Sequence, residues 1–182
     1  MKNSFFSKFA KLSLALLFVS CIAFVACKPE PEAPSNSKPI TSTEISADDT
    51  LIGKWADDYS DWNTYDNNYD CQIAVDFIET ASYGKQESKI YIVRTTADSG
   101  YIYYQFSTDV TGYGPAPDYK PFTIEAKDKW GAIAFKELTA TSVKMCDFAD
   151  PSNEFPTTLE DCIKKYTIEG GYFNNMPEWT KL

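Results

Sequence analysis

Regularly spaced oxygen-bearing side chains are the first place to look for chemistry in this chain. Asp66, Asn68 and Asp70 alternate in the way that begins a calcium-binding loop of the EF-hand type. That loop also needs a glycine at its sixth position and a glutamate at its twelfth, whereas Cys71 and Phe77 occupy these positions. We therefore expect no EF-hand and no metal centre, and only a looser site with oxygen ligands is left open.

The composition removes most of the chemistry that enzymes use. The chain contains no histidine, so the commonest general base and the commonest transition-metal ligand are both missing. A glycosidase needs only two carboxylates at a defined separation, but 26 acidic residues are more simply a solvated surface. We expect a protein that is not an enzyme and has no cofactor. The net charge of −9 excludes nucleic acid as a partner, because its phosphates would be repelled.

The expected folded domain contains three cysteines, Cys71, Cys146 and Cys162. A disulfide between Cys146 and Cys162 would close a loop worth about 3 kcal/mol in the chain-entropy model and would leave Cys71 free. The alternative is that all three are buried thiols that pack as small apolar side chains. Both interpretations stay open, because the sequence does not fix the geometry that a disulfide requires.

A loop from residue 57 to residue 70 combines aromatic rings with polar side chains. It contains Tyr59, Trp62 and Tyr65, interleaved with Asp and Asn residues. Aromatic rings stack on sugar faces while carboxylates and amides bind hydroxyl groups, and tyrosine is also enriched where proteins bind one another. The loop is either a surface that binds a glycan or a host protein, or an ordinary solvated loop with a few rings packed on the domain.

The N-terminal residues predict export from the cytoplasm. Lys2, Lys8 and Lys11 lie in or next to a short basic segment, and an uncharged run of Leu, Phe, Val and Ala follows over residues 12–26. This run is shorter than the roughly 20 apolar residues that a membrane-spanning helix needs. A basic segment followed by a short apolar one is typical of a signal peptide.

The end of this apolar run resembles the lipobox of bacterial lipoproteins. Phe24-Val25-Ala26-Cys27 places apolar and small residues before a cysteine, in the relaxed form used by spirochaetes. The resemblance implies that residues 1–26 are removed and that Cys27 receives the lipid. Cys21 is a competing site, but cleavage there would leave an apolar stretch on the mature protein. An ordinary secretory signal cut after Ala26 is the other alternative.

The residues after Cys27 predict a tether followed by a single domain. Residues 27–50 are rich in Pro, Ser, Thr and acidic residues, and Ile40 and Ile45 are their only large aliphatic residues. Such a segment buries too little apolar surface to offset the entropy lost on ordering, so we expect it to be disordered. Residues 51–182 then form one domain of ordinary size.

Apolar alternation with a period of two predicts strands through most of this domain. Two hairpins are expected, because β-branched and aromatic segments flank short polar turns. The first hairpin joins residues 89–95 to 101–107, and the second joins residues 130–138 to 142–148. Further strands are predicted at residues 51–55, 72–79, 122–125 and around 167–169.

One helix interrupts the β pattern late in the chain. Leu159, Cys162 and Tyr166 follow helical spacing, and Thr158 lies three residues before Asp161, as in a capping box. The fold class is therefore mainly β. We expect a small antiparallel barrel of eight strands with one short late helix.

Two segments give this barrel a family resemblance. Gly53-Lys54-Trp55 resembles the Gly-x-Trp opening of the lipocalin superfamily, in which the Trp helps to close the base of an eight-stranded barrel. The paired segments 130–135 and 138–145 are similar to strands of lipocalin-like lipoproteins in spirochaetes and related bacteria. The resemblance implies a lipocalin-like barrel over residues 51–182, although the later lipocalin motifs are absent.

The interior of such a barrel either is filled by side chains or holds one small ligand. The inward positions predicted from the alternation are Ile73, Val75, Phe77, Ile102, Tyr104, Phe106, Ile133, Phe135, Val143 and Met145. Among these, the larger side chains are the candidate ligand-binding residues: Phe77, Tyr104, Phe106, Phe135 and Met145.

We expect a non-enzymatic lipoprotein of the cell envelope, anchored through its lipid to the outer membrane or the cell surface. Its barrel would bind a small apolar ligand. The alternative is an interaction module with a filled interior that presents the aromatic loop to a glycan or a host protein.

Overall fold

The computed structural model describes residues 41–57, 69–113 and 120–182, which belong to one folded unit. These residues are mainly β, as predicted, with antiparallel strands and one short helix. The elements are β1 (Thr43–Glu44), β2 (Gly53–Asp57), β3 (Cys71–Ile73), β4 (Phe77–Thr80), β5 (Gly84–Glu87), β6 (Tyr91–Arg94), β7 (Gly100–Gln105), β8 (Val110–Tyr113), β9 (Pro121–Ile124), β10 (Trp130–Lys136), β11 (Ser142–Asp147), α2 (Leu159–Lys165) and β12 (Glu178–Lys181).

Ten of these strands form one antiparallel sheet in the order β1-β6-β7-β10-β11-β12-β2-β3-β4-β5. Both predicted hairpins are confirmed, because β6 pairs with β7 and β10 pairs with β11. Phe135 lies opposite Met145 in the second hairpin, so these two residues share one face of the sheet. We call this face the inner face.

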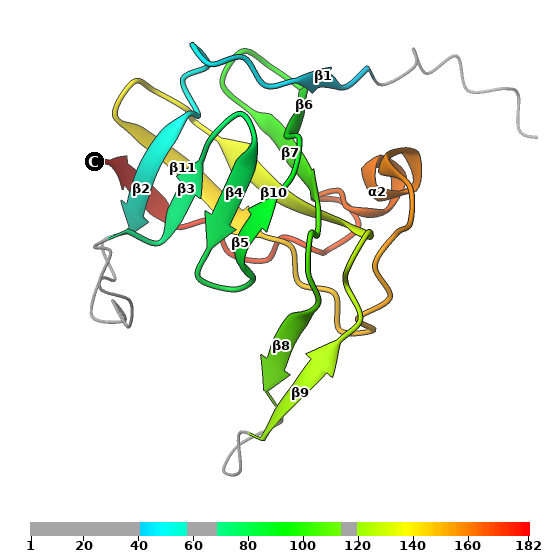
Figure 1. Cartoon of the computed structure of the whole chain (residues 1–182). Helices are drawn as coiled ribbons and strands as arrows, with labels where there is room; N and C mark the ends of the chain where they lie inside the picture. The colour runs from blue at the N-terminus through cyan, green and yellow to red at the C-terminus, as the bar shows by residue number, and fades with distance from the viewer. Residues whose placement is uncertain (1–40, 58–68, 114–119) are drawn as a thin grey trace, which may run out of the picture. The chain divides into compact units, whose positions relative to one another are not determined.

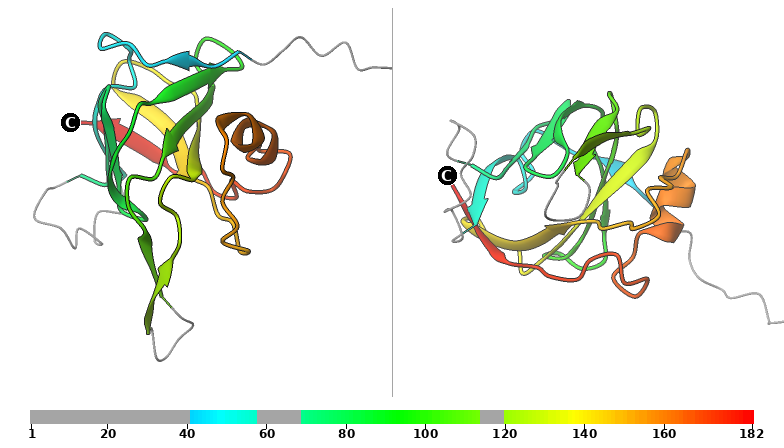
Figure 2. Two further views of the ribbon diagram at one scale, coloured as in Figure 1. Left: turned by 45° about the vertical axis from the view of Figure 1, so that its right-hand side comes forward. Right: turned by 90° about the horizontal axis from the view of Figure 1, so that it is seen from below.

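The sheet curls until β5 lies near β7, as Figures 1 and 2 show, but it does not close into a barrel. The prediction of a closed eight-stranded barrel is therefore wrong, since the sheet has ten strands and two edges, β1 and β5. β7 pairs with β10 on one side and, over Gly100–Tyr103, with β6 on the other, and no backbone ladder joins it to β5.

Side chains bridge the gap between β5 and β7 instead. The Gln86 side-chain oxygen accepts a hydrogen bond from the Ser107 N–H at 2.9 Å, and Ser88 Oγ accepts one from the Gln105 N–H at 2.8 Å. The Gln86 amide group donates to the Tyr83 carbonyl at 2.7 Å, so this buried side chain is satisfied on both sides. We call these contacts the β5–β7 seam.

The inner face carries the core of the folded unit. Trp55 is fully buried on β2, and its indole N–H donates to the Leu51 carbonyl at 2.9 Å, which satisfies the polar atom of the ring. The central strands contribute alternate residues to the same core. These are Ile102, Tyr104, Ile133 and Phe135, all exposed by 2% or less.

The opposite face of β7 and β10 is covered by α2, which is seen beside these strands in Figure 1. The predicted cap is confirmed: Thr158 Oγ1 accepts from the Asp161 N–H at 3.1 Å and bonds the Asp161 carboxylate at 2.7 Å. Cys162 is fully buried on the apolar side of the helix, where its thiol lies 3.7 Å from the Gly131 carbonyl.

The single strand predicted over residues 72–79 is wrong. The chain reverses between β3 and β4, where the Ala74 N–H donates to the Phe77 carbonyl at 2.9 Å. Val75 therefore lies in the turn and is 46% exposed, and Phe77 is only partly buried. Ile73 and Ile78, which are opposite each other in the ladder, take the inward positions of this segment.

The two ends of the folded unit also differ from the prediction. No strand forms around residues 167–169, because residues 168–171 make a turn in which the Gly171 N–H donates to the Ile168 carbonyl. The last strand is β12. Residues 41–50, included in the predicted tether, contribute β1, which pairs with β6, and the buried Ile45. Residues 27–40 lie outside the described part of the chain.

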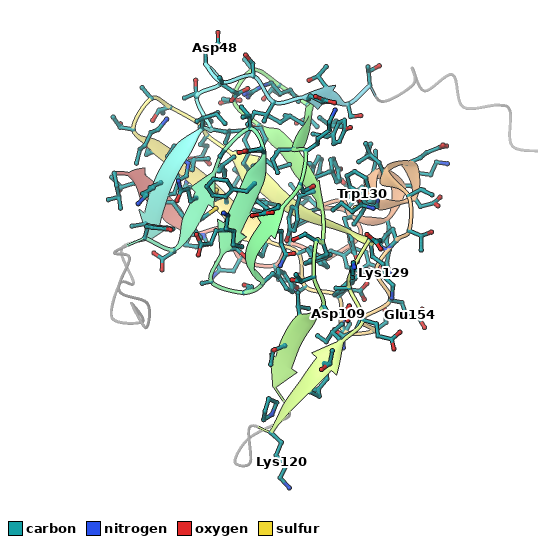
Figure 3. The ribbon with its side chains drawn as sticks, in the orientation of Figure 1. Asp48, Asp109, Lys120, Lys129, Trp130 and Glu154 are labelled. Carbon is teal, nitrogen blue, oxygen red and sulfur yellow. The ribbon has the colours of Figure 1, made fainter. Side chains whose placement is uncertain are left out.

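Strands β8 and β9 form a separate two-stranded sheet that extends away from the ten-stranded one (Figures 1 and 2). The strand predicted at residues 122–125 corresponds to β9. Asp109 ties the base of this hairpin together, because its carboxylate accepts from the Ala126 and Lys127 N–H groups at 3.0 Å each, and Lys120 lies near the far end (Figure 3). No helix among the described residues is long and apolar enough to cross a membrane.

Candidate functional site

A pocket of about 550 Å³ lies where β11 leaves the sheet, between the β4–β5 turn and the segment that leads into β12. We call it the β11 pocket. Most of its exposed lining is apolar. The lining residues are Asp70, Ala81, Ser82, Tyr83, Met145, Cys146, Asp147, Phe148, Ala149, Asn175, Pro177 and Trp179.

Asp147 places a carboxyl group in this pocket at a position where a strand would ordinarily carry an apolar side chain. It follows Val143 and Met145 at steps of two and lies opposite Ile133 in the ladder, so it belongs to the inner face. Burial raises the pKa of Asp147 to about 6, against the weaker opposing effect of hydrogen bonds from the Ser82 and Thr80 side chains.

The negative charge of Asp147 reaches other groups in the interior. Burial first, and then the charge of Asp147, raises the pKa of the Cys71 thiol and of the Tyr104 hydroxyl well above their ordinary values. Both groups are therefore neutral near pH 7. None of the residues that line the pocket is a lysine or an arginine, so its walls supply no positive charge to balance this carboxylate.

Among the described residues, two buried polar atoms of the inner face lack a hydrogen-bond partner. They are the hydroxyl of Tyr104, which is fully buried, and the indole N–H of Trp179. Trp179 lies opposite Val143 in the β11–β12 ladder and lines the β11 pocket. An unpaired buried donor is costly unless something binds it, so a hydrogen-bond acceptor in the pocket would remove this penalty.

A second hollow of about 640 Å³ adjoins the first, and both are lined by Tyr83 and Ala149. Tyr83 is fixed between the two. Its ring stacks on Phe148 with centroids 5.2 Å apart and meets Phe106 edge-on at 5.4 Å. Its hydroxyl donates to the Phe148 carbonyl at 3.2 Å. This aromatic packing gives the β11 pocket a rigid wall.

Asp150 lines the second hollow, but its carboxylate is fully engaged. Lys165 Nζ lies 2.7 Å from it, and the Tyr166 hydroxyl donates to it at 3.0 Å. The Ser152 hydroxyl donates at 2.7 Å and the Ser152 N–H at 3.0 Å. Burial alone would raise the pKa of Asp150, yet these partners, Lys165 foremost, hold it below its ordinary value. Asp150 is therefore a structural group.

The residues predicted to bind an apolar ligand lie mostly in the packed core. Tyr104, Phe106, Phe135 and Met145 are exposed by 1% or less, and Met145 is the one of them that lines the β11 pocket. Phe77 is partly buried at the start of β4, with Lys85 Nζ 4.6 Å from its ring centroid. The inner face is thus filled along most of its length and hollow at one end.

The disulfide considered between Cys146 and Cys162 is not formed, because Cys71, Cys146 and Cys162 are free thiols in the structure. The Cys146 thiol lies 3.0 Å from the Asp147 carbonyl at the pocket, whereas the Cys162 thiol faces the Gly131 carbonyl under α2. The two sulfur atoms therefore face different parts of the sheet.

Several predicted site residues lie outside the described part of the chain. They are the lipidation site Cys27 and the aromatic residues Tyr59, Trp62 and Tyr65, together with Asp66 and Asn68 of the calcium-like spacing. Within the described residues, no group of three Cys, Asp or Glu side chains is arranged to hold a metal ion.

No sequence motif marks Asp147 among the 26 acidic residues. A signal was nevertheless present, because the alternation that placed Val143 and Met145 inward also places Asp147 on the same face, and an acidic residue at an inward strand position is unusual. Trp179 and Asn175 carried no such signal, since only the packing of the C-terminal segment brings them to the pocket.

We compared the chain with known protein families, curated proteins and solved structures. No protein-family model, curated protein or solved structure matches the chain.

Proposed function

We propose that this protein is a non-enzymatic, lipid-anchored lipoprotein of the cell envelope that binds a small and largely apolar molecule in the β11 pocket. The observation that carries the binding part is the pocket itself, which opens at the end of a filled apolar core. Its volume of about 550 Å³ falls in the range of roughly 300–1,000 Å³ that is usual for small-molecule sites.

The residues that line the pocket support this choice of site. Met145 and Phe148 are buried side chains that reach the pocket from the core, and Trp179 and Tyr83 add aromatic walls. Asp147, Ser82 and Asn175 supply a small number of polar groups. Apolar walls with a few placed polar groups are the usual composition of a site that binds a small organic molecule.

A titration with benzyl alcohol, a small neutral probe, tests the pocket. The indole N–H of Trp179 is buried and unpaired, so its NMR signal should shift when a molecule enters next to it. Ala149 is exposed and lines both hollows, so Ala149→Trp should fill the opening and abolish the shift without disturbing the core. Ala97 is exposed between β6 and β7 and lines neither hollow, so Ala97→Trp is the matched control and should leave binding unchanged.

The anchoring part rests on the sequence around Cys27. Acyl chains add about 0.8 kcal/mol of membrane affinity for each buried methylene, and more than one chain makes anchoring durable. The test is the intact mass of the protein made in a bacterial host that processes lipoproteins. We expect the mass of residues 27–182 plus acyl groups, lost in Cys27→Ala and retained in Cys21→Ala, which removes the competing site. Cleavage after Ala26 without added mass would contradict the anchor.

The second candidate function is an interaction module that binds a glycan or a host protein through the aromatic loop. Side chains fill most of the inner face, and this observation favours the second candidate. A protein whose core is packed has to bind its partners through its surface. Trp62→Ala and Tyr65→Ala should then abolish retention on immobilised glycans or host proteins, whereas Ala149→Trp should not affect it.

A further inference from the structure

We propose that the ligand of the β11 pocket carries a positive charge on an apolar body, as a protonated primary amine or a quaternary ammonium ion does. This inference rests on the proposed binding function and names the chemical class of the ligand. It follows from the balance of charges around Asp147 and from the aromatic walls of the pocket.

Within the described part of the chain, the ionisable groups around the Asp147 carboxyl include no positive partner. The groups that interact with it electrostatically are the Cys71 thiol on β3, the Cys146 thiol on β11 and the hydroxyls of Tyr83 and Tyr104, all of which are neutral or acidic. The remaining ionisable residue of the pocket lining is Asp70, another acid. None of the described residues that line the pocket is a lysine or an arginine, so a bound cation would supply a positive charge that the lining lacks.

Two other carboxylates at low exposure in the described residues are paired with a cation of the chain. Asp49, with a side chain 17% exposed, meets Arg94 at 2.8 Å, and Asp150 meets Lys165 at 2.7 Å. The partners of Asp147 among the described residues are the hydroxyls of Ser82 and Thr80, and burial raises its pKa to about 6. It is nevertheless mostly ionised near pH 7, so a charge lies in the pocket without a counter-ion from the residues that line it.

The aromatic walls favour an organic cation over a bare metal ion. Trp179 and Tyr83 line the same pocket as Asp147, and the faces of such rings attract ammonium groups. Most of the exposed lining is apolar, which suits a hydrocarbon body. An anionic molecule would be repelled by Asp147, and a neutral one would leave the charge of Asp147 unbalanced.

A pair of probes of nearly equal size tests the charge. Benzylamine is protonated throughout the range from pH 5 to pH 7.5, whereas benzyl alcohol is neutral throughout. Both are titrated into the purified full-length protein while the indole N–H signal of Trp179 is followed. At pH 7.5 we expect benzylamine to bind at least about tenfold more tightly than benzyl alcohol. At pH 5, where most of Asp147 is protonated, the benzylamine affinity should fall about tenfold.

Variants test whether Asp147 is the group responsible. Asp147→Asn keeps the size of the side chain and removes its charge, so the preference for benzylamine and its pH dependence should both disappear. Glu125→Gln removes an equal charge from an exposed residue outside the pocket, and it should change neither. The pH experiment on the unchanged protein gives the same information if Asp147→Asn does not fold.

The outcomes separate this inference from the function on which it rests. If benzyl alcohol binds as tightly as benzylamine at both pH values, the charge inference is overturned while binding in the pocket stands. If neither probe shifts the Trp179 signal, or if both still bind in Ala149→Trp, the pocket is not the binding site and both proposals are overturned.

Discussion

Asp147 and Asp150 are three residues apart, and their carboxyl groups show opposite behaviour. The pKa of Asp147 is raised to about 6 by burial, whereas the pKa of Asp150 is lowered because Lys165, Ser152 and Tyr166 bind its charged form and outweigh the effect of burial. Both side chains line hollows in the same part of the molecule. The partners that the fold supplies therefore decide which carboxyl stabilises the structure and which remains available to a ligand.

The partners of Asp150 come from the segment that follows β11. Ser152 lies in the turn after it, Lys165 ends α2, and Tyr166 caps the same helix. The carboxylate thus joins α2 to the end of β11. Asp147 faces the interior of the curled sheet, whereas α2 packs on the outer face of β7 and β10. The partners of Asp147 in the described part of the chain are short hydroxyl side chains, those of Ser82 and Thr80. Four variants test this contrast.

Asp150→Ala should have the largest effect. It leaves Lys165 and Tyr166 without their shared partner, and breaking a buried ion pair costs about 3 kcal/mol. Urea unfolding at pH 7 measures the loss, with Glu125→Ala, an exposed acid, as the control. Because the pKa of Asp150 is lowered on folding, the difference should shrink as the pH falls below the ordinary value of 3.8. A loss under about 1 kcal/mol at pH 7 would show that the cluster is not structural.

Asp147→Asn should have the opposite sign and stabilise the fold at pH 7. The pKa of Asp147 is about 6 in the folded state against an ordinary value of 3.8, so the folded state binds more protons between these values. The unchanged protein should therefore lose up to about 3 kcal/mol as the pH rises from about 4 to 6, and the variant should not. Urea unfolding at pH 4 and pH 7 measures both proteins. Equal stability of the two at pH 7 would contradict the unbalanced charge.

Ser82→Lys should give Asp147 a cationic partner, as Lys165 is for Asp150, and should lower its pKa. Ser82 is exposed and its side chain already hydrogen-bonds the Asp147 carboxylate, so a lysine there supplies the missing cation. We expect the pKa of Asp147 to fall by about one unit, which corresponds to about 1.4 kcal/mol. The titration of the Asp147 carboxyl carbon by NMR follows this change. The control Ser82→Ala removes a hydrogen bond that lowers the pKa and should therefore raise it.

Thr158→Ala should have the smallest effect and act only on the Asp150 side. Loss of the cap of α2 should cost about 1 kcal/mol, because the Asp161 N–H loses its acceptor. The helix carries Lys165, so the pKa of Asp150 should rise slightly while that of Asp147 stays unchanged. Thermal unfolding and the NMR titration of both carboxyls measure these effects. An equal shift in Asp147 would mean that the two regions are coupled.

The parts of the fold that local patterns determine were predictable from sequence. The hairpins β6–β7 and β10–β11 have long alternating segments around polar turns, and Thr158 with Asp161 marks the start of α2. The turn between β3 and β4 was missed because no Gly, Pro or Asn marks it, and the β-branched Val75 looks like part of a strand. Strand β12 was missed because its pairing with β2 and β11 is long-range.

The candidate site was less predictable than the fold. Burial of Tyr104, Phe106, Phe135 and Met145 follows from their alternation, but whether an inward side chain lines a hollow depends on packing between segments far apart in the chain. Asp70, Ser82 and Trp179 come from three separate parts of the sequence and meet only in the folded state. No spacing rule connects such residues.

The β5–β7 seam determines where the wall of the core should first admit solvent. The backbone N–H groups of Glu87, Gln105 and Ser107 are bound by side-chain oxygens instead of a neighbouring strand. Rotation of a single side chain releases such an amide, whereas an amide in a ladder is released only when two strands separate. In heavy water, these three amides should therefore exchange their hydrogens well before the amides between β7 and β10. Local opening of the folded unit would then begin at the seam.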